Sequence, residues 1–216
     1  MSSTVAELGR IASTRWGLVT TAQAEAAGIP RMTLSRLAAS GVLGRVAQGV
    51  YRLAGAPELE HEAIYAAWLA LSPIESAPAG EIPAVVAAGE TAATLLGIGD
   101  FYPEGATFIV PTRRSTRLDG IRLRTRALSL TEVTFAESVP TLTVERTIAD
   151  LVETWTDRSL VADTIADAVA QGRLVAPQLL SRYLDPLAAA NGYANGDELA
   201  ADLLALAGVG PVSERG

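Results

Sequence analysis

The first fifty residues carry short helical patterns that are separated by glycine. Apolar side chains recur at helical spacing over residues 3–12. A short extended segment then ends at Thr20, a side chain suited to capping a helix. An alanine-rich helix over residues 22–27 is stopped by Gly28. The pattern therefore predicts two short helices with an extended segment between them.

A third helix follows Pro30, whose missing N–H suits the first turn of a helix. Leu34, Leu37 and Ala38 share one face at i, i+3, i+4 spacing, and Gly41 ends the helix. The opposite face presents Met32, Ser35, Arg36 and Ala39, with Arg31 at the helix start and Thr33 beside this face. We expect the leucine face to be buried and the arginine face to be exposed.

Two short strand-like segments follow, "VLGRV" and "GVYRL", joined at "AQG". Gly49 can adopt the positive φ that a tight hairpin requires. Three helices followed by a β-ribbon predict a winged helix-turn-helix domain over residues 1–54.

Residues 55–216 predict a mixed α/β domain with a small sheet and a helical C-terminus. A helix over residues 58–72 precedes a buried strand and a short helix, and "ATFIV" and "IRLRTR" predict two more strands. Thr143 is placed to cap the next helix, and acidic helices rich in alanine and leucine follow. The fold class predicted for the whole chain is α+β.

The balance of basic and acidic residues also changes after residue 53. The 216-residue protein has a formal charge of −7, and every basic side chain is an arginine. Residues 1–53 contain six arginines and two acids, a balance of +4, whereas the remainder contains eleven arginines and 22 acids. This asymmetry favours a basic module that meets an anion, carried on an acidic body.

A basic winged helix predicts binding to double-stranded DNA. A helix fits the major groove, where arginine and short polar side chains reach base edges. We expect Arg36, Ser35 and Met32 to contact bases, and Arg31 and Thr33 to contact phosphates. Three further residues of the ribbon are expected on the backbone or in the minor groove: Arg45, Gln48 and Arg52.

A second cationic segment lies in the predicted α/β domain. Six arginines fall within fourteen residues: Arg113, Arg114, Arg117, Arg122, Arg124 and Arg126. The last three alternate with Ile121, Leu123 and Thr125, so a strand over 121–126 would have one apolar and one cationic face. This face has three interpretations: it binds nucleic-acid phosphates, it binds an acidic partner protein, or it neutralises the chain's own acidic helices.

The sequence offers little for catalysis, so we expect no enzyme. Its single histidine, His61, stands between two glutamates and is interpreted as a surface or helix-capping residue. Nucleophile-elbow, P-loop, dinucleotide-binding and metal-ligand motifs are missing. We therefore predict neither a cofactor nor a metal.

The cysteine content and the length of the apolar segments predict the cellular compartment. The sequence has no cysteine, which excludes disulfides, and no apolar run long enough to span a bilayer. Its first residues do not follow the order of a signal peptide. We expect a cytoplasmic protein without a membrane partner.

Several of these segments resemble the AbiEi family of antitoxins from type IV toxin–antitoxin systems. The segment "GLVTTAQAEAAGIPRMTLSRLAASGVLGRVAQGVYRL" is similar to the family's N-terminal domain. The segments "AGETAATLLGIG", "FIVPTRRSTR", "IRLRTRALS" and "VPTLTVERTIADLVE" resemble its second domain, with a Thr-x-x-Arg-Thr-x-x-Asp-Leu helix start. The resemblance runs from about residue 4 to residue 155.

The resemblance implies a protein with two functions. Members bind inverted repeats upstream of their own operon through the winged helix and repress it. Their C-terminal domain counters a cognate nucleotidyltransferase toxin, generally without a stable complex. The winged-helix arginines would then bind the chain's own promoter, and the cluster from Arg113 to Arg126 would serve the second function or additional DNA contacts.

Two alternatives remain. One is a winged-helix transcriptional regulator that senses a small ligand in its second domain and has no toxin partner. The other is a nuclease with an atypical site that includes Glu145 or Asp150. A nucleotidyltransferase gene immediately downstream would favour the antitoxin over the sensor, and metal-dependent DNA cleavage would favour the nuclease.

Overall fold

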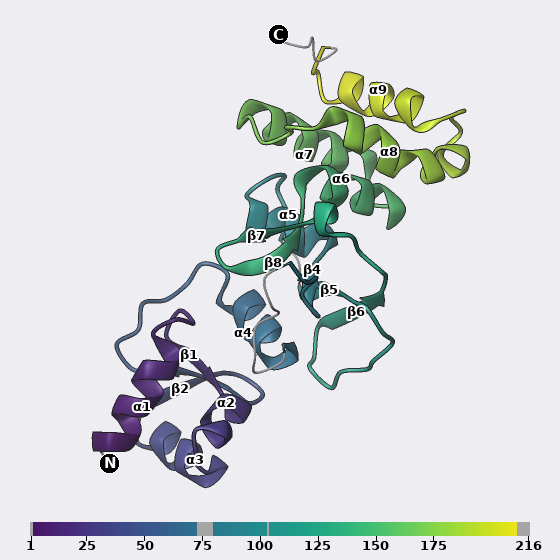
Figure 1. Cartoon of the computed structure of the whole chain (residues 1–216). Coiled ribbons are helices and arrows are strands. Elements are labelled where there is room, and N and C mark those ends of the chain that lie inside the picture. The colour runs from purple at the N-terminus through teal and green to yellow at the C-terminus, as the bar shows by residue number, and fades with distance from the viewer. Residues whose placement is uncertain (1, 73–79, 103, 211–216) are drawn as a thin grey trace. The chain divides into compact units, whose positions relative to one another are not determined.

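A computed structural model of the protein describes residues 2–72, 80–102 and 104–210. The chain forms two compact units (Figure 1). The first comprises Met1–Pro78 with Arg117–Asp119, and the second comprises Ala79–Thr116 with Gly120–Gly216. Both units combine helices with a small sheet, so the predicted α+β fold class is confirmed.

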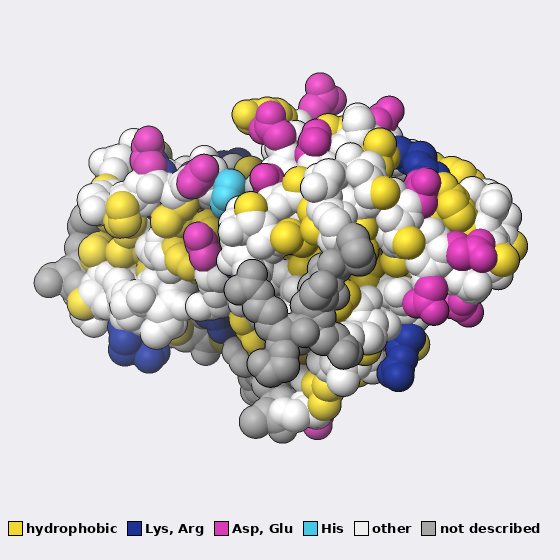
Figure 2. Space-filling view, turned by 90° about the horizontal axis from the view of Figure 1, so that it is seen from above, with side chains coloured by type: hydrophobic (Ala, Val, Ile, Leu, Met, Phe, Trp, Pro, Cys, Tyr) yellow, Lys and Arg dark blue, Asp and Glu magenta, His cyan; other side chains and the backbone are white. Residues whose placement is uncertain are grey.

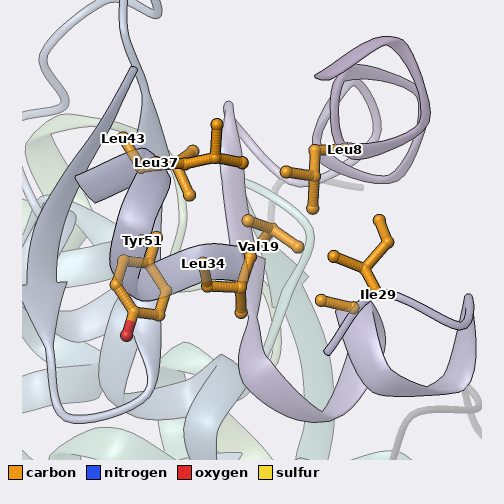
Figure 3. Close-up of a cluster of buried hydrophobic side chains, with 8 residues drawn as sticks. Leu8, Val19, Ile29, Leu34, Leu37, Leu43 and Tyr51 are labelled. Carbon is orange, nitrogen blue, oxygen red and sulfur yellow. The ribbon is translucent and has the colours of Figure 1, made fainter. Parts of the chain in front are cut away.

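The first unit is a winged helix-turn-helix. Its elements are α1 (Ser2–Ala12), β1 (Leu18–Thr20), α2 (Thr21–Ala26), α3 (Arg31–Ala39), β2 (Leu43–Ala47), β3 (Val50–Leu53) and α4 (Glu62–Leu71). The three strands form an antiparallel sheet in the order β1-β3-β2. One apolar cluster joins Leu8 of α1 and Val19 of β1 to Leu34 and Leu37 of α3 and Tyr51 of β3 (Figure 3).

The second unit is built on a five-stranded mixed sheet in the order β6-β5-β4-β8-β7. Its strands are β4 (Val86–Ala87), β5 (Ala106–Val110), β6 (Ile121–Thr125), β7 (Val133–Ala136) and β8 (Val139–Leu142). The inner neighbours β5 and β8 run antiparallel and parallel to β4, respectively, while β6 is parallel to β5 and β7 antiparallel to β8. The cationic strand predicted at 121–126 is therefore an edge strand.

Helices supply the rest of the second unit. They are α5 (Gly89–Leu96), η1 (Leu130–Glu132), α6 (Val144–Glu153), α7 (Arg158–Ala170), α8 (Pro177–Ala188), η2 (Ala189–Asn191) and α9 (Gly196–Leu206). Helix α6 is the centre of this layer because it packs against α5, α7 and α8. It begins at the predicted cap, where Thr143 Oγ1 accepts a hydrogen bond from the Arg146 backbone N–H.

One hairpin of the second sheet was not expected from the sequence. Strands β7 and β8 are joined at Glu137 and Ser138, which have φ values of 49° and 71°. Two successive positive φ values are typical of the tight turn that usually carries asparagine or glycine. Neither residue type stands here, so no local pattern indicated the hairpin.

Helix α4 packs against all three strands of the first sheet. The compact units accordingly group it with the winged helix, whereas the sequence analysis divides the chain after residue 54. The boundary between residues 54 and 55 stays a prediction. In the part of the chain that the structure describes, no helix is long and apolar enough to cross a membrane.

Candidate nucleic-acid interface

The turn between α2 and α3 is held by local hydrogen bonds. The Thr20 hydroxyl accepts a hydrogen bond from the Gln23 N–H, and the Gln23 side chain accepts one from the Thr20 N–H. At the other end, the Ile29 N–H donates to Ala24 O across Gly28, which has φ +76°. These bonds satisfy helix ends that would otherwise be unpaired. They fix the direction in which the chain enters α3.

Burial of one face sets the rotation of α3. Leu34 and Leu37 lie in the apolar cluster with Tyr51, and they are almost completely buried (Figure 3). Because a helix turns about 100° per residue, the residues between them must face outward. Arg31, Met32, Ser35 and Arg36 are all exposed, and Thr33 is half-buried beside them. The structure thus brings these five predicted residues onto one accessible stretch of α3.

The register of the wing decides where Arg45 lies. Arg45 of β2 is opposite Tyr51 of β3, and residues directly opposite each other share a face of the sheet. Tyr51 packs against Leu34 and Leu37 of α3, so Arg45 lies on the face of the sheet that α3 covers. Its guanidinium is nevertheless exposed, because β2 is an edge strand.

The tip of the wing is a tight turn at Gln48 and Gly49. Gly49 has φ +76°, as expected for this turn, and Gln48 is exposed. The Thr21 N–H of α2 donates a 2.8 Å hydrogen bond to Gly49 O. The wing tip is therefore fastened to the start of the helix-turn-helix.

Arg52 has a different environment from the one that the sequence suggested. It follows Tyr51 on β3, so its side chain leaves from the opposite face of the sheet. Arg52 Nη1 lies 3.0 Å from Glu62 Oε1 of α4, and its Nη2 lies 3.4 Å from Glu58 Oε1. The side chain is half-buried, and two carboxylates of the same chain already neutralise it.

The remaining arginines of residues 1–53 fall into two groups. Arg10 pairs with Glu7 at 2.6 Å, and its hydrogen bond lowers the pKa of Glu7. Arg15 lies 5.7 Å above the Trp68 ring. Three arginines remain exposed and form no ion pair with any described residue: Arg31, Arg36 and Arg45. These three are the cations of the winged helix that are available to an anionic ligand.

The six arginines between Arg113 and Arg126 also fall into two groups. Arg124 Nη1 lies 2.6 Å from Asp150 Oδ2, and Arg126 Nη1 lies 2.5 Å from Glu153 Oε2. Both carboxylates belong to α6 and are also approached by Arg146, which is 2% exposed. For Arg124 and Arg126, the anionic neighbour is therefore the chain's own acidic helix.

This network changes the ionisation of Glu153. Partial burial raises the pKa of a carboxyl group, but the hydrogen bonds and charges of Arg126 and Arg146 outweigh burial and lower the pKa of Glu153. Glu153 is therefore held in its ionised form to a lower pH than a free glutamate. Its negative charge holds Arg126, the residue that follows β6, close to α6.

The other predicted arginines of this cluster lie on the surface. Arg113, Arg114 and Arg117 are exposed in the connection between β5 and β6, and Arg122 is exposed on β6. No carboxylate among the described residues forms an ion pair with Arg113, Arg117 or Arg122. The six arginines therefore have two kinds of environment. Arg124 and Arg126 form ion pairs with α6, and the other four are exposed on the surface.

Several important contacts were missed by sequence reasoning, although each had a local signal. Thr20 was expected to cap α2, but the reciprocal bond from its N–H to the Gln23 side chain was not, although Thr-x-x-Gln is the usual capping-box spacing. Arg146 and Asp150 have opposite charge at i, i+4 spacing, which places them on one helix face.

His61 is half-buried at the start of α4, makes no side-chain cap hydrogen bond, and reaches the surface (Figure 2).

Comparison with known proteins agrees with the winged helix. Residues 7–54 match a family described as "Transcriptional regulator, AbiEi antitoxin". The crystal structure of RV2827C protein from Mycobacterium tuberculosis is similar to this chain, with a TM-score of 0.56 and 19% sequence identity. The similarity covers 96% of this chain and 77% of that one, and at this identity it concerns the fold alone.

No sequence among the curated proteins matches the chain. The resemblance drawn from the residues is nevertheless confirmed where the family match lies. The N-terminal winged helix, over residues 7–54, is of the kind found in the AbiEi antitoxin family of transcriptional regulators.

Proposed function

We propose that this protein is a DNA-binding antitoxin that represses its own operon by binding inverted repeats in its promoter. The observation that carries the proposal is the accessible arginine set of the winged helix. Arg31, Arg36 and Arg45 lack carboxylate partners among the described residues, while the other three arginines of residues 1–53 are engaged. A folded domain in an acidic protein thus keeps three cations free on its helix and wing.

Each residue of the accessible stretch has a role in this proposal. Arg36 donates two hydrogen bonds to a guanine edge in the major groove, and Ser35 and Met32 contact neighbouring bases. Arg31 and Thr33 contact phosphates at the start of α3. In the wing, Arg45 and Gln48 contact the DNA backbone. Arg52 instead orients the wing through Glu62, because its charge is already neutralised.

The proposed second function belongs to residues 55–216, which would counter a nucleotidyltransferase toxin without a stable complex. Support comes from the resemblance of "VPTLTVERTIADLVE" to the second domain of the antitoxins. In this proposal Arg113, Arg117 and Arg122 supply the anion contacts of that domain, and Arg124 and Arg126 hold its edge strand in place.

The test of DNA binding is a salt titration with the full-length protein. The probe is the DNA upstream of its own gene, and a scrambled fragment of the same length is the control. Specific binding that weakens steeply with salt is expected, because phosphate contacts release counterions. Equal affinity for both fragments at every salt concentration would contradict an operator-binding role.

The toxin function needs its own test. A gene for a nucleotidyltransferase beside this one identifies the toxin to use, and co-expression should restore growth of cells that produce that toxin. Variants that replace Arg113, Arg117 and Arg122 by serine should lose this protection but retain operator binding. Protection that is fully retained would remove these arginines from the second function.

A further inference from the structure

Helix α6 ends in an unusual way, with a tryptophan at a position that normally carries glycine. The Trp155 N–H donates to Val152 O, and the Thr156 N–H donates to Leu151 O. These two bonds form the helix-ending motif in which the residue after the cap is left-handed. Trp155 occupies that position with φ +58°. Its Cβ makes this conformation sterically unfavourable, whereas glycine adopts it freely.

The strain at Trp155 is not offset by burial of its ring. The side chain is 71% exposed, although tryptophan is one of the largest apolar side chains. Residues with a strained backbone cluster at active sites and at places that clamp a ligand. Exposed tryptophans that stand beside a pocket are also frequent anchors of recognition. The surface around Trp155 is therefore a candidate ligand-binding site.

A cavity of about 270 Å³ opens beside this tryptophan. Its lining is aliphatic where it is deepest, with Val161 of α7 and Leu199 and Leu203 of α9 all essentially buried. Trp155, Arg158 and Asn191 stand among the more exposed lining residues. The volume lies just below the range of drug-sized sites, so it suits a ligand of one or two fused rings.

The polar groups around the cavity limit the charge of a ligand. Arg158 forms an ion pair with Asp202 and donates a 3.0 Å hydrogen bond to the Tyr193 hydroxyl. Its guanidinium also lies 5.6 Å from the centre of the Tyr193 ring. Because Asp202 balances its charge, Arg158 does not leave a free cation for an anionic ligand. The pair favours a neutral ligand.

Asn191 supplies the polar group that can give direction to a ligand. Its Nδ2 donates a 2.9 Å hydrogen bond to Leu187 O, which fixes the amide and leaves Oδ1 as the remaining acceptor. Among the described residues, none donates a hydrogen bond to this oxygen. A ring N–H is the group that complements this accessible oxygen, because an amide oxygen only accepts hydrogen bonds.

We propose that this cavity binds a neutral, planar heteroaromatic ring with an N–H donor, of the size of indole. The ring stacks on the Trp155 indole, fills the aliphatic pocket above Leu199 and Leu203, and donates its N–H to Asn191 Oδ1. This site lies entirely within the second unit and is independent of the proposed DNA and toxin functions. It gives the second unit a small-molecule binding capacity of its own.

The test is a titration of the full-length, isotope-labelled protein with indole, followed by nuclear magnetic resonance. The chain has three tryptophans, so each indole N–H signal can be assigned separately. Trp16 stacks on Tyr65 and Trp68 is buried, and both serve as internal references. Saturable shifts are expected at Trp155 and Asn191 but not at Trp16 or Trp68. 1-Methylindole, which lacks the donor, should bind at least threefold more weakly.

Two variants test the stacking surface and the space of the cavity. Trp155→Gly removes the stacking surface and places the preferred residue at the helix end, so it should retain the thermal midpoint and bind indole at least tenfold more weakly. Ala190→Phe adds a ring at an exposed lining residue and should also block binding. Absence of saturable shifts up to the solubility limit of indole, or equal affinity in Trp155→Gly, would overturn the proposal.

Discussion

Arg52 of the wing and Glu62 of helix α4 form an ion pair, with 3.0 Å between Nη1 and Oε1. The pair joins the face of the sheet that is turned away from α3 to the helix that follows the winged helix. This ion pair distinguishes Arg52 from Arg45, although both are arginines of the wing. Arg52 is paired with a carboxylate of the same chain, whereas Arg45 is exposed and forms no ion pair with a described residue.

The first prediction compares these two arginines. Arg52→Gln should lower the free energy of unfolding by about 1 kcal/mol, because it removes a partly buried, charge-assisted hydrogen bond. Arg45→Gln should leave unfolding unchanged and reduce the salt slope of DNA binding by about one unit, as expected for one lost phosphate contact. Urea unfolding and salt titrations of both variants check this. A salt slope that changes for Arg52→Gln alone would reverse the assignment.

The second prediction concerns sequence discrimination by α3. Arg36→Ala should reduce the preference for the operator over a scrambled site by roughly 1–3 kcal/mol, because a bidentate contact to guanine is lost. Arg10→Ala is the matched control, since Arg10 is exposed but pairs with Glu7 on α1. Competition binding at fixed salt measures the preference. If both variants discriminate as well as the parent protein, Arg36 does not contact a base.

The third prediction tests the division of the second arginine cluster. Arg124→Gln should destabilise the protein by about 2 kcal/mol, because it removes a cation from Asp150, whose side chain is fully buried. Arg122→Gln, two residues away on the same strand, should change stability by less than about 0.5 kcal/mol because Arg122 is exposed. Denaturant unfolding of the two variants provides the comparison. Equal losses would mean that the network does not depend on Arg124.

The fourth prediction is a pH dependence. The pKa of Glu153 is lowered in the folded protein, so its contribution to stability is present above the pKa of an unfolded glutamate. That contribution is lost as the pH falls below 4.5, the ordinary pKa of a glutamate, toward the lower folded value. Unfolding free energies measured between pH 7 and pH 3.5 should therefore decrease less steeply for Glu153→Gln than for the parent protein. Identical slopes would show that Glu153 does not contribute.

Much of the winged helix could be predicted because its signals are local. The spacing of Leu34 and Leu37 fixed the buried face of α3, and Gly49 indicated the wing turn. The β7–β8 hairpin was not predictable in this way. Its turn residues, Glu137 and Ser138, do not belong to the types that favour positive φ, and the turn forms where β7 pairs with β8.

The sequence by itself determined the helices, the wing and the surplus of arginine at the N-terminus, because these depend on neighbours along the chain. Only the tertiary structure decided which arginines remain available to a ligand. Arg52 and Arg124 are neutralised by Glu62 and Asp150, while Arg45 and Arg122 keep exposed guanidinium groups. An ion pair requires two charges within a few ångströms, and that proximity arises when a strand and a distant helix pack together.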